Sequence, residues 1–147
     1  MDGYLVGGSL GTDDLFAFFG YGVVLQFIDD FQDIAEDTAS GHSSMFTRGS
    51  GERPLDELAG RLLSFTCETV RLLDRPGREG GGALSGLIEG SCVFLILEAA
   101  ARYRHLFTAP YLETLEAFSP LRFTYLAGLH DRVRTTMAGR EHALFPA

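Results

Sequence analysis

The chain has 147 residues and a formal net charge of −8, which arises from 20 acidic residues against 12 arginines, with no lysine. This surplus of negative charge argues against a basic surface for nucleic-acid phosphates, so we expect no nucleic-acid partner. With 46% hydrophobic and 22% charged residues, the chain has the composition of a globular domain rather than of a disordered protein.

The negative charge is concentrated in the first third of the chain. Residues 1–47 contain eight acidic residues and no Arg, whereas the remaining hundred contain twelve acidic residues and twelve arginines. Only Cys67 and Cys92 are present, which fits a reducing compartment. The N-terminus carries no secretory signal, and the most apolar run, 92–97, is far shorter than the roughly 20 residues that span a bilayer. The sequence therefore predicts a cytoplasmic protein without a transmembrane segment.

Helical periodicity dominates the chain and predicts a single all-α domain over 1–147. The first helix begins at the capping residue Thr12 and covers about 13–37, in spite of Gly20 and Gly22. Each glycine costs a helix roughly 1 kcal/mol, so the pair indicates close approach of a neighbouring helix or ligand, or else simple tolerance. A loop rich in Gly, Ser and Thr is expected over 38–54.

Four further helices are predicted between residues 55 and 140. The first covers about 55–72 and is followed by a glycine-rich connector over 77–82. The second covers about 84–106. The last two begin at Thr108-Ala109-Pro110 and at Ser119-Pro120. The helix over 84–106 is apolar nearly all round between 92 and 101, which predicts a buried central position. The last helix has an apolar stripe that ends with Met137. The fold class is therefore an all-α helical bundle.

Acidic side chains lie on the first predicted helix among Phe and Ile residues. Asp29, Asp33 and Asp37 are spaced four residues apart, so their carboxylates follow one helix face, where like charges repel. No basic residue lies at helical spacing within this cluster, because the first one in the chain is Arg48. A buried cluster without compensation costs free energy, so we expect arginines from elsewhere or a metal ion to neutralise it.

Magnesium is the metal that this set of ligands favours. Mg²⁺ prefers carboxylate oxygens and is commonly held by one or two protein carboxylates together with water and substrate phosphates. We therefore expect a Mg²⁺ site whose partner is a diphosphate. The alternative from charge patterning alone is a solvated acidic helix face without a ligand.

The stretch Gln26-Phe27-Ile28-Asp29-Asp30-Phe31-Gln32-Asp33 resembles the second aspartate-rich motif of the class I isoprenoid synthases, the family of polyprenyl diphosphate and terpenoid synthases. The likeness includes the Gln three residues before the Asp pair and the third Asp three residues after it, although Leu25 stands where Phe is usual. It implies a helical bundle similar to the C-terminal half of that fold. It also implies a Mg²⁺ site formed by Asp29, Asp30 and Asp33, with Gln26 beside the substrate and with Glu36 and Asp37 as further candidates.

The same resemblance implies residues that contact the diphosphate. The family follows the motif with a Gly-Lys pair, and here the loop reads Ser40-Gly41-His42, so His42 or Arg48 is expected to replace the Lys. Terpenoid cyclases carry an Arg-Tyr pair near the C-terminus, to which Arg102 and Tyr103 are similar. The alternative for this pair is a purely structural role at a helix end, where cations are favourable.

The implied activity is Mg²⁺-dependent ionisation of a prenyl diphosphate with release of pyrophosphate, and we lean toward an enzyme. The family uses two acidic motifs on facing helices, whereas this sequence contains one. We therefore expect a fragment, a half-protein that pairs with a copy of itself or with a complementary N-terminal half, or a degenerate relative, and we favour the first two. The competing interpretation is a non-catalytic helical module that binds isoprenoids or another protein.

Overall fold

The computed structural model describes residues 11–51, 53–73, 81–129, 132–133 and 135–136, and every structural statement concerns these residues. They form helices, turns and short irregular links, and no strand occurs among them. The predicted all-α class is therefore confirmed for the described chain. Two compact units are present, Met1–Ile96 and Leu97–Ala147, and each is described by itself.

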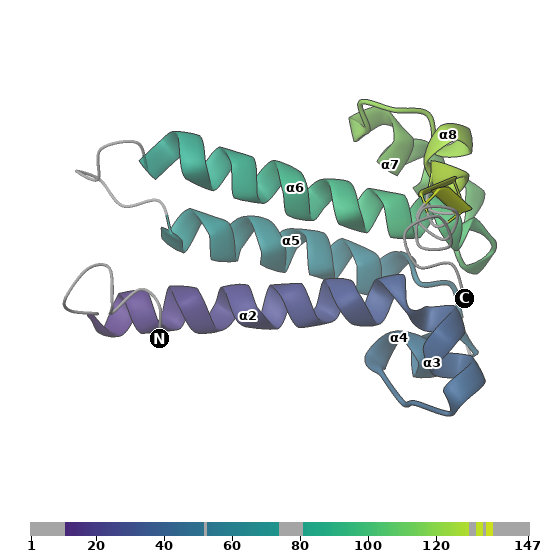
Figure 1. Ribbon diagram of the computed structural model, residues 1–147, viewed down its shortest axis with the longest axis horizontal. Coiled ribbons are helices and arrows are strands. Elements are labelled where there is room, and N and C mark those ends of the chain that lie inside the picture. Colours follow the sequence, from purple (N-terminus) through teal and green to yellow (C-terminus); the bar gives the residue numbers. More distant parts are fainter. Residues whose placement is uncertain (1–10, 52, 74–80, 130–131, 134, 137–147) are drawn as a thin grey trace, which may run out of the picture. The chain divides into compact units, whose positions relative to one another are not determined.

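The first unit is built on helices α2 (Thr12–Gln32) and α5 (Asp56–Leu73), which lie side by side (Figure 1). Gly20 permits their close approach, because a Cβ at this position would lie 3.0 Å from Cγ2 of the buried Thr69. A Cβ on Gly22 would meet no atom within 4 Å. The close-approach interpretation therefore applies to Gly20, whereas Gly22 has no neighbouring helix against it.

The predicted helix over 13–37 is interrupted at Asp33. Helix α2 ends at Gln32, Asp33 has φ −100° and ψ 14°, and α3 (Ile34–Ser40) follows directly. The backbone hydrogen bonds from Asp33 N to Asp29 O (2.9 Å) and from Asp37 N to Asp33 O (2.8 Å) bridge the interruption. The chain then leaves the helix at Gly41, whose φ of 75° favours glycine.

The segment 38–54, expected as a loop, contains a further helix, α4 (Met45–Ser50). Its start is a capping box, in which Thr47 N donates to Ser44 Oγ (3.2 Å) and Ser44 N donates to Thr47 Oγ1 (2.8 Å). The fully buried Phe46 stacks on Phe31 of α2 with ring centroids 4.8 Å apart. Six residues are too few for a periodic pattern, so this helix depends on its cap and its aromatic anchor.

Helix α6 (Gly81–Arg102) corresponds to the third predicted helix. It is buried from Ile96 to Ala101, but Leu84 and Leu87 are exposed, so the predicted central position holds only for its C-terminal part. Residues Gly82–Arg102 are long and apolar enough to cross a membrane by length and composition alone. Core helices of soluble proteins meet the same criterion of length and composition.

The second unit continues from the end of α6 through a 3₁₀ turn, η1 (Arg104–Leu106), to α7 (Ala109–Phe118) and α8 (Phe123–Ala127). Helix α7 begins as predicted, with Pro110 in its first turn. Helix α8 begins at Phe123 rather than at Ser119, because the Ser119 hydroxyl forms a turn by accepting from Leu121 N (3.2 Å). Residues 74–80, which include most of the expected connector 77–82, and Met137 lie outside the described residues.

The buried apolar side chains of each unit come from several of its helices and from the links between them. In the first unit they include Val24, Ile28, Phe31, Phe46, Leu55, Leu62, Val70 and Ile96. In the second unit they include Leu97, Ala100, Phe107, Leu115, Phe123 and Leu126. Because Ile28 and Phe31 carry the buried side of α2, the polar residues between them are turned away from the core.

Candidate functional site

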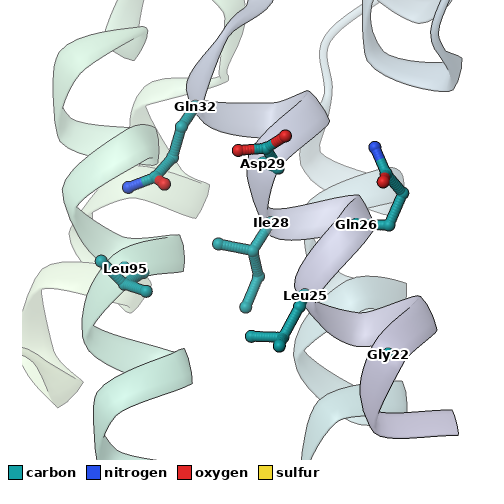
Figure 2. A pocket seen from close by; sticks show the side chains of 7 residues that line it. All are labelled: Gly22, Leu25, Gln26, Ile28, Asp29, Gln32 and Leu95. Carbon is teal, nitrogen blue, oxygen red and sulfur yellow. The ribbon is translucent and has the colours of Figure 1, made fainter. Parts of the chain in front are cut away.

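A pocket of about 390 Å³ lies beside the acidic motif of α2 (Figure 2). Asp29 is its acidic lining residue. Figure 2 shows Ile28 and Gln32 pointing toward Leu95 of α6, whereas Gln26 lies on another side of α2. The full lining consists of Gly22, Leu25, Gln26, Ile28, Asp29, Gln32 and Leu95. The pocket therefore joins one carboxylate and two amides to an apolar wall.

Asp29 and Asp30 have different surroundings, although they are neighbours in the motif. Asp29 is exposed in the pocket, whereas the half-buried Asp30 is not part of the lining. Asp30 Oδ1 accepts a hydrogen bond from Gln26 Nε2 at 2.8 Å, across one helical turn. Adjacent residues on an α-helix point about 100° apart, which accounts for the divergence of the two carboxylates.

The remaining predicted carboxylates lie outside this pocket. Asp33 is half-buried at the helix interruption, and Asp37 is half-buried on α3 with Glu36 exposed beside it. Among the described residues, no three His, Cys, Asp or Glu side chains are grouped closely enough to hold a metal ion. The apolar side of α2 faces the core, and the motif carboxylates are exposed or half-buried.

His42 and Arg48, the expected replacements for the family's Lys, do not line the Asp29 pocket. His42 is exposed after Gly41, and its backbone N–H donates to Asp37 O at 2.8 Å. Arg48 is exposed on α4 and lines a different pocket, together with Arg53 and Arg61. The first arginines of the chain therefore gather with one another rather than around Asp29.

Arg102 forms an ion pair with Glu98 on the same helix, in the second unit. The Arg102 Nη2 atom lies 2.7 Å from Glu98 Oε1 and 2.8 Å from Oε2, and Nε lies 3.2 Å from Oε1. Burial lowers the pKa of the Arg102 guanidinium, but the hydrogen bonds and charge of Glu98 outweigh it, so the pKa is raised. The guanidinium carbon also lies 5.8 Å from the ring centroid of the buried Tyr103. These contacts supply a structural role, and the substrate-binding role stays a prediction.

Sequence reasoning did not identify the partners that surround these residues. Gln32 and Leu95 complete the Asp29 pocket, and Glu98 neutralises Arg102. The Glu98–Arg102 pair was visible as an acid and a base four residues apart on one predicted helix. Gln32 was visible as a polar residue one turn after Asp29, whereas Leu95 had no local signal because it comes from another helix.

The two cysteines are free thiols in the first unit. Burial raises the pKa of Cys92. Burial also raises the pKa of Cys67, as do the hydrogen bond to Glu89 and its negative charge, while Arg71 acts in the opposite direction. Neither cysteine lines the Asp29 pocket, so they are not candidates for its chemistry.

No protein-family model, curated protein or solved structure matches this chain. The similarity to isoprenoid synthases therefore rests on the motif residues themselves. The Asp29 pocket is the candidate functional site, because it contains a motif carboxylate and an apolar wall together.

Proposed function

We propose that this chain is a class I isoprenoid synthase-like protein that ionises a prenyl diphosphate with Mg²⁺ and releases pyrophosphate. The observation that carries the proposal is the position of Asp29, a motif carboxylate in a pocket with Leu25, Ile28 and Leu95. A prenyl diphosphate has the same two parts, an anionic head that binds metal and an apolar chain. The pocket offers a complementary surface to each part.

The side chains at this pocket fit a magnesium ion that is shared with a substrate. Mg²⁺ in phosphate-binding sites uses one or two protein carboxylates and completes its coordination with water and phosphate oxygens, so three clustered acids are not required. Asp29 would hold the ion, with Asp33 one turn further along and Asp30 held by Gln26 as the next candidates. When bound, Mg²⁺ would neutralise the diphosphate and stabilise the leaving pyrophosphate.

The chain's own residues would perform the other tasks. Asp29 makes no ion pair within the described residues, so its negative charge is available to a ligand. The amide of Gln32, which points toward Leu95, would supply N–H donors near the diphosphate, whereas Gln26 donates to Asp30. Leu25, Ile28 and Leu95 would contact the apolar chain of the prenyl group, on which a carbocation forms when the C–O bond to the diphosphate breaks.

The test is pyrophosphate release from geranyl or farnesyl diphosphate by the full chain, with and without Mg²⁺. We expect release that requires Mg²⁺ and that falls by at least about 100-fold in Asp29→Asn, since one electrostatic contact to the reacting group is commonly worth that much. Glu68→Gln is the matched control, because Glu68 is an exposed acid of α5 that does not line the pocket. Undiminished turnover in a double variant, Asp29→Asn with Asp30→Asn, would overturn the assignment.

A non-catalytic module is the second candidate, and one observation favours it. The described residues bring a single motif carboxylate into the pocket, while Phe16 and Phe19 of α2 remain exposed as apolar surface. A module of this kind would bind an isoprenoid or another protein without turnover. A rise in melting temperature with Mg²⁺ and pyrophosphate, but no release of pyrophosphate from prenyl diphosphates, would favour this function over the enzyme.

A further inference from the structure

A second pocket, of about 400 Å³, gathers three arginines where α4 approaches the start of α5. Arg48 comes from α4, Arg53 from the link between the two helices, and Arg61 from α5. The remaining lining residues are Glu57 and the mainly apolar set Met45, Gly49, Pro54, Leu55 and Leu58. None of these residues lines the Asp29 pocket, so the two pockets are separate.

Close packing of α4 against α5 creates this arginine pocket. A Cβ on Gly49 would lie 2.7 Å from Leu58 Cδ1 and 3.1 Å from Leu55 Cδ2, so glycine is what permits the contact. Phe46 holds α4 from its other side by stacking on Phe31. Arg48 therefore lines the same hollow as Arg61, thirteen residues later in the chain.

Two of the three guanidinium groups retain donors for a ligand. Arg61 is neutralised by Glu57, with Nη2 and Oε1 2.5 Å apart. The Arg48 side chain makes one hydrogen bond, from Nε to Ser44 O at 3.4 Å. The Arg53 side chain makes no hydrogen bond or ion pair with any described residue. The described lining of the pocket thus has two positive charges in excess.

We propose that the arginine pocket binds a phosphate group without the help of a metal ion. The planar guanidinium donors of arginine match pairs of phosphate oxygens, and these charge-assisted hydrogen bonds are among the strongest in proteins. Two excess positive charges match a dianionic phosphate better than they match a single carboxylate. The inference goes beyond the function proposed above, because it uses other residues and no Mg²⁺.

The experiment is isothermal titration calorimetry of the full chain with pyrophosphate, in low salt and with EDTA present. We expect saturable binding that weakens by about tenfold or more in Arg53→Gln, and further in Arg48→Gln with Arg53→Gln, because each substitution removes charge-assisted hydrogen bonds to the phosphate. Arg71→Gln is the matched control, since Arg71 is exposed near the other end of α5 and should leave binding unchanged. Circular dichroism of each variant verifies that the helices are intact.

The same titration distinguishes pyrophosphate binding at the arginine pocket from binding at the Asp29 pocket. Asp29→Asn should bind pyrophosphate in EDTA as the unmodified chain does. Absence of saturable binding in EDTA, or equal binding by the folded double arginine variant, overturns the inference. Pyrophosphate binding that requires Mg²⁺ and Asp29 but neither arginine also overturns it, while supporting the function proposed for the other pocket.

A vesicle flotation assay identifies the source of the phosphate. Vesicles that contain phosphatidic acid present a phosphate headgroup, and pure phosphatidylcholine vesicles are the control. Co-flotation with phosphatidic acid that is lost in Arg48→Gln with Arg53→Gln assigns the pocket to a lipid headgroup. Saturable pyrophosphate binding without co-flotation assigns it to a soluble phosphoryl ligand.

Discussion

Glu98 and Asp29 are acidic residues of long helices, but Glu98 is buried and paired with a base, whereas Asp29 is exposed and has no ion pair with a described residue. The Glu98 side chain is 7% exposed and makes a two-oxygen ion pair with Arg102, one turn later on α6. Asp29 is exposed on α2, has no basic residue at helical spacing and lines an open pocket.

The difference shows what a partner within the same helix does for a carboxylate. Burial of an unpaired charge costs several kcal/mol, so Glu98 can be buried because its counter-charge is built into the same helix. Asp29 lacks such a partner and stays where water or a ligand can solvate it. A paired acid therefore serves stability, whereas an unpaired acid in a pocket remains available for binding. Five predictions test this contrast, in order of decreasing expected effect.

Removal of the Glu98 charge should have the largest effect on stability. Glu98→Gln leaves Arg102 partly buried without its counter-charge, and we expect a loss of about 3 kcal/mol in the free energy of unfolding, measured by urea denaturation. Glu57→Gln is the control, because its pair with Arg61 has the same spacing but side chains that are 67% and 75% exposed. Exposed pairs of this kind contribute less than about 1 kcal/mol. Equal losses in the two variants would contradict the role of burial.

Glu116 is an acid that is paired with a backbone group instead of with a base. Its Oε1 accepts a hydrogen bond from Phe123 N (2.8 Å) and so caps the start of α8. Glu116→Ala leaves this N–H without its partner, and we expect a loss of about 1 kcal/mol in the free energy of unfolding. Glu113→Ala, on an exposed position of the same helix, should change stability by less than half of that. A neutral result for Glu116→Ala would show that water replaces the cap.

Glu89 is an acid whose partner is a neutral thiol. Because burial and Glu89 raise the pKa of Cys67, the thiolate is scarcer in the folded chain than in the unfolded one. Glu89→Gln should lower this pKa and accelerate alkylation of Cys67 by iodoacetamide severalfold at pH 8, as followed by mass spectrometry of the Cys67 peptide. Alkylation of Cys92 in the same sample is the internal control, and an unchanged Cys67 rate would contradict the interaction.

The raised pKa of Cys67 also contributes to the pH dependence of stability, as do the raised pKa values of Cys92 and Tyr21. A group whose pKa is higher in the folded state contributes stability that is present below the unfolded pKa and is lost as the pH rises through the folded pKa. We therefore expect the free energy of unfolding to decline above the ordinary pKa of a cysteine. Glu89→Gln should move this decline to lower pH and make it smaller.

Asp29 should show the smallest effect on stability. In the absence of metal and diphosphate, Asp29→Asn removes no ion pair with a described residue, so we expect a change below about 0.5 kcal/mol in the free energy of unfolding. The measurement is urea denaturation in EDTA, with Glu36→Gln as the exposed control. A loss above about 1 kcal/mol would show that Asp29 has a structural partner, and the contrast with Glu98 would then fail.

Much of the helical pattern was predictable because its signals are local. The amphipathic spacing after Leu55 predicted α5 closely, and Thr108-Ala109-Pro110 marked the start of α7. Helix α4 was missed because it has six residues in a segment rich in Ser, Thr and Gly, and its burial depends on the contact of Phe46 with Phe31. The interruption at Asp33 also had no signal, since the backbone hydrogen bonds continue across it.

The candidate site was predictable only in part. The motif points to Asp29, Asp30 and Asp33 alike, whereas the structure separates Asp29 from Asp30 by pocket lining and hydrogen bonding. The motif also placed Arg48 beside the diphosphate, whereas the structure brings Arg48 together with Arg53 and Arg61. The side of a helix that faces a pocket depends on its neighbours, and a single sequence does not contain that information.

The sequence by itself determined the all-α class and the four-residue spacing of the aspartates. These features depend on residues within one or two helical turns, where the geometry of the helix is enough. Tertiary structure alone decided that Asp29 shares a pocket with Leu95 and that three arginines meet beside Leu58. Such groupings join residues far apart in the chain, and they require close approaches such as those of Gly20 to Thr69 and of Gly49 to Leu58.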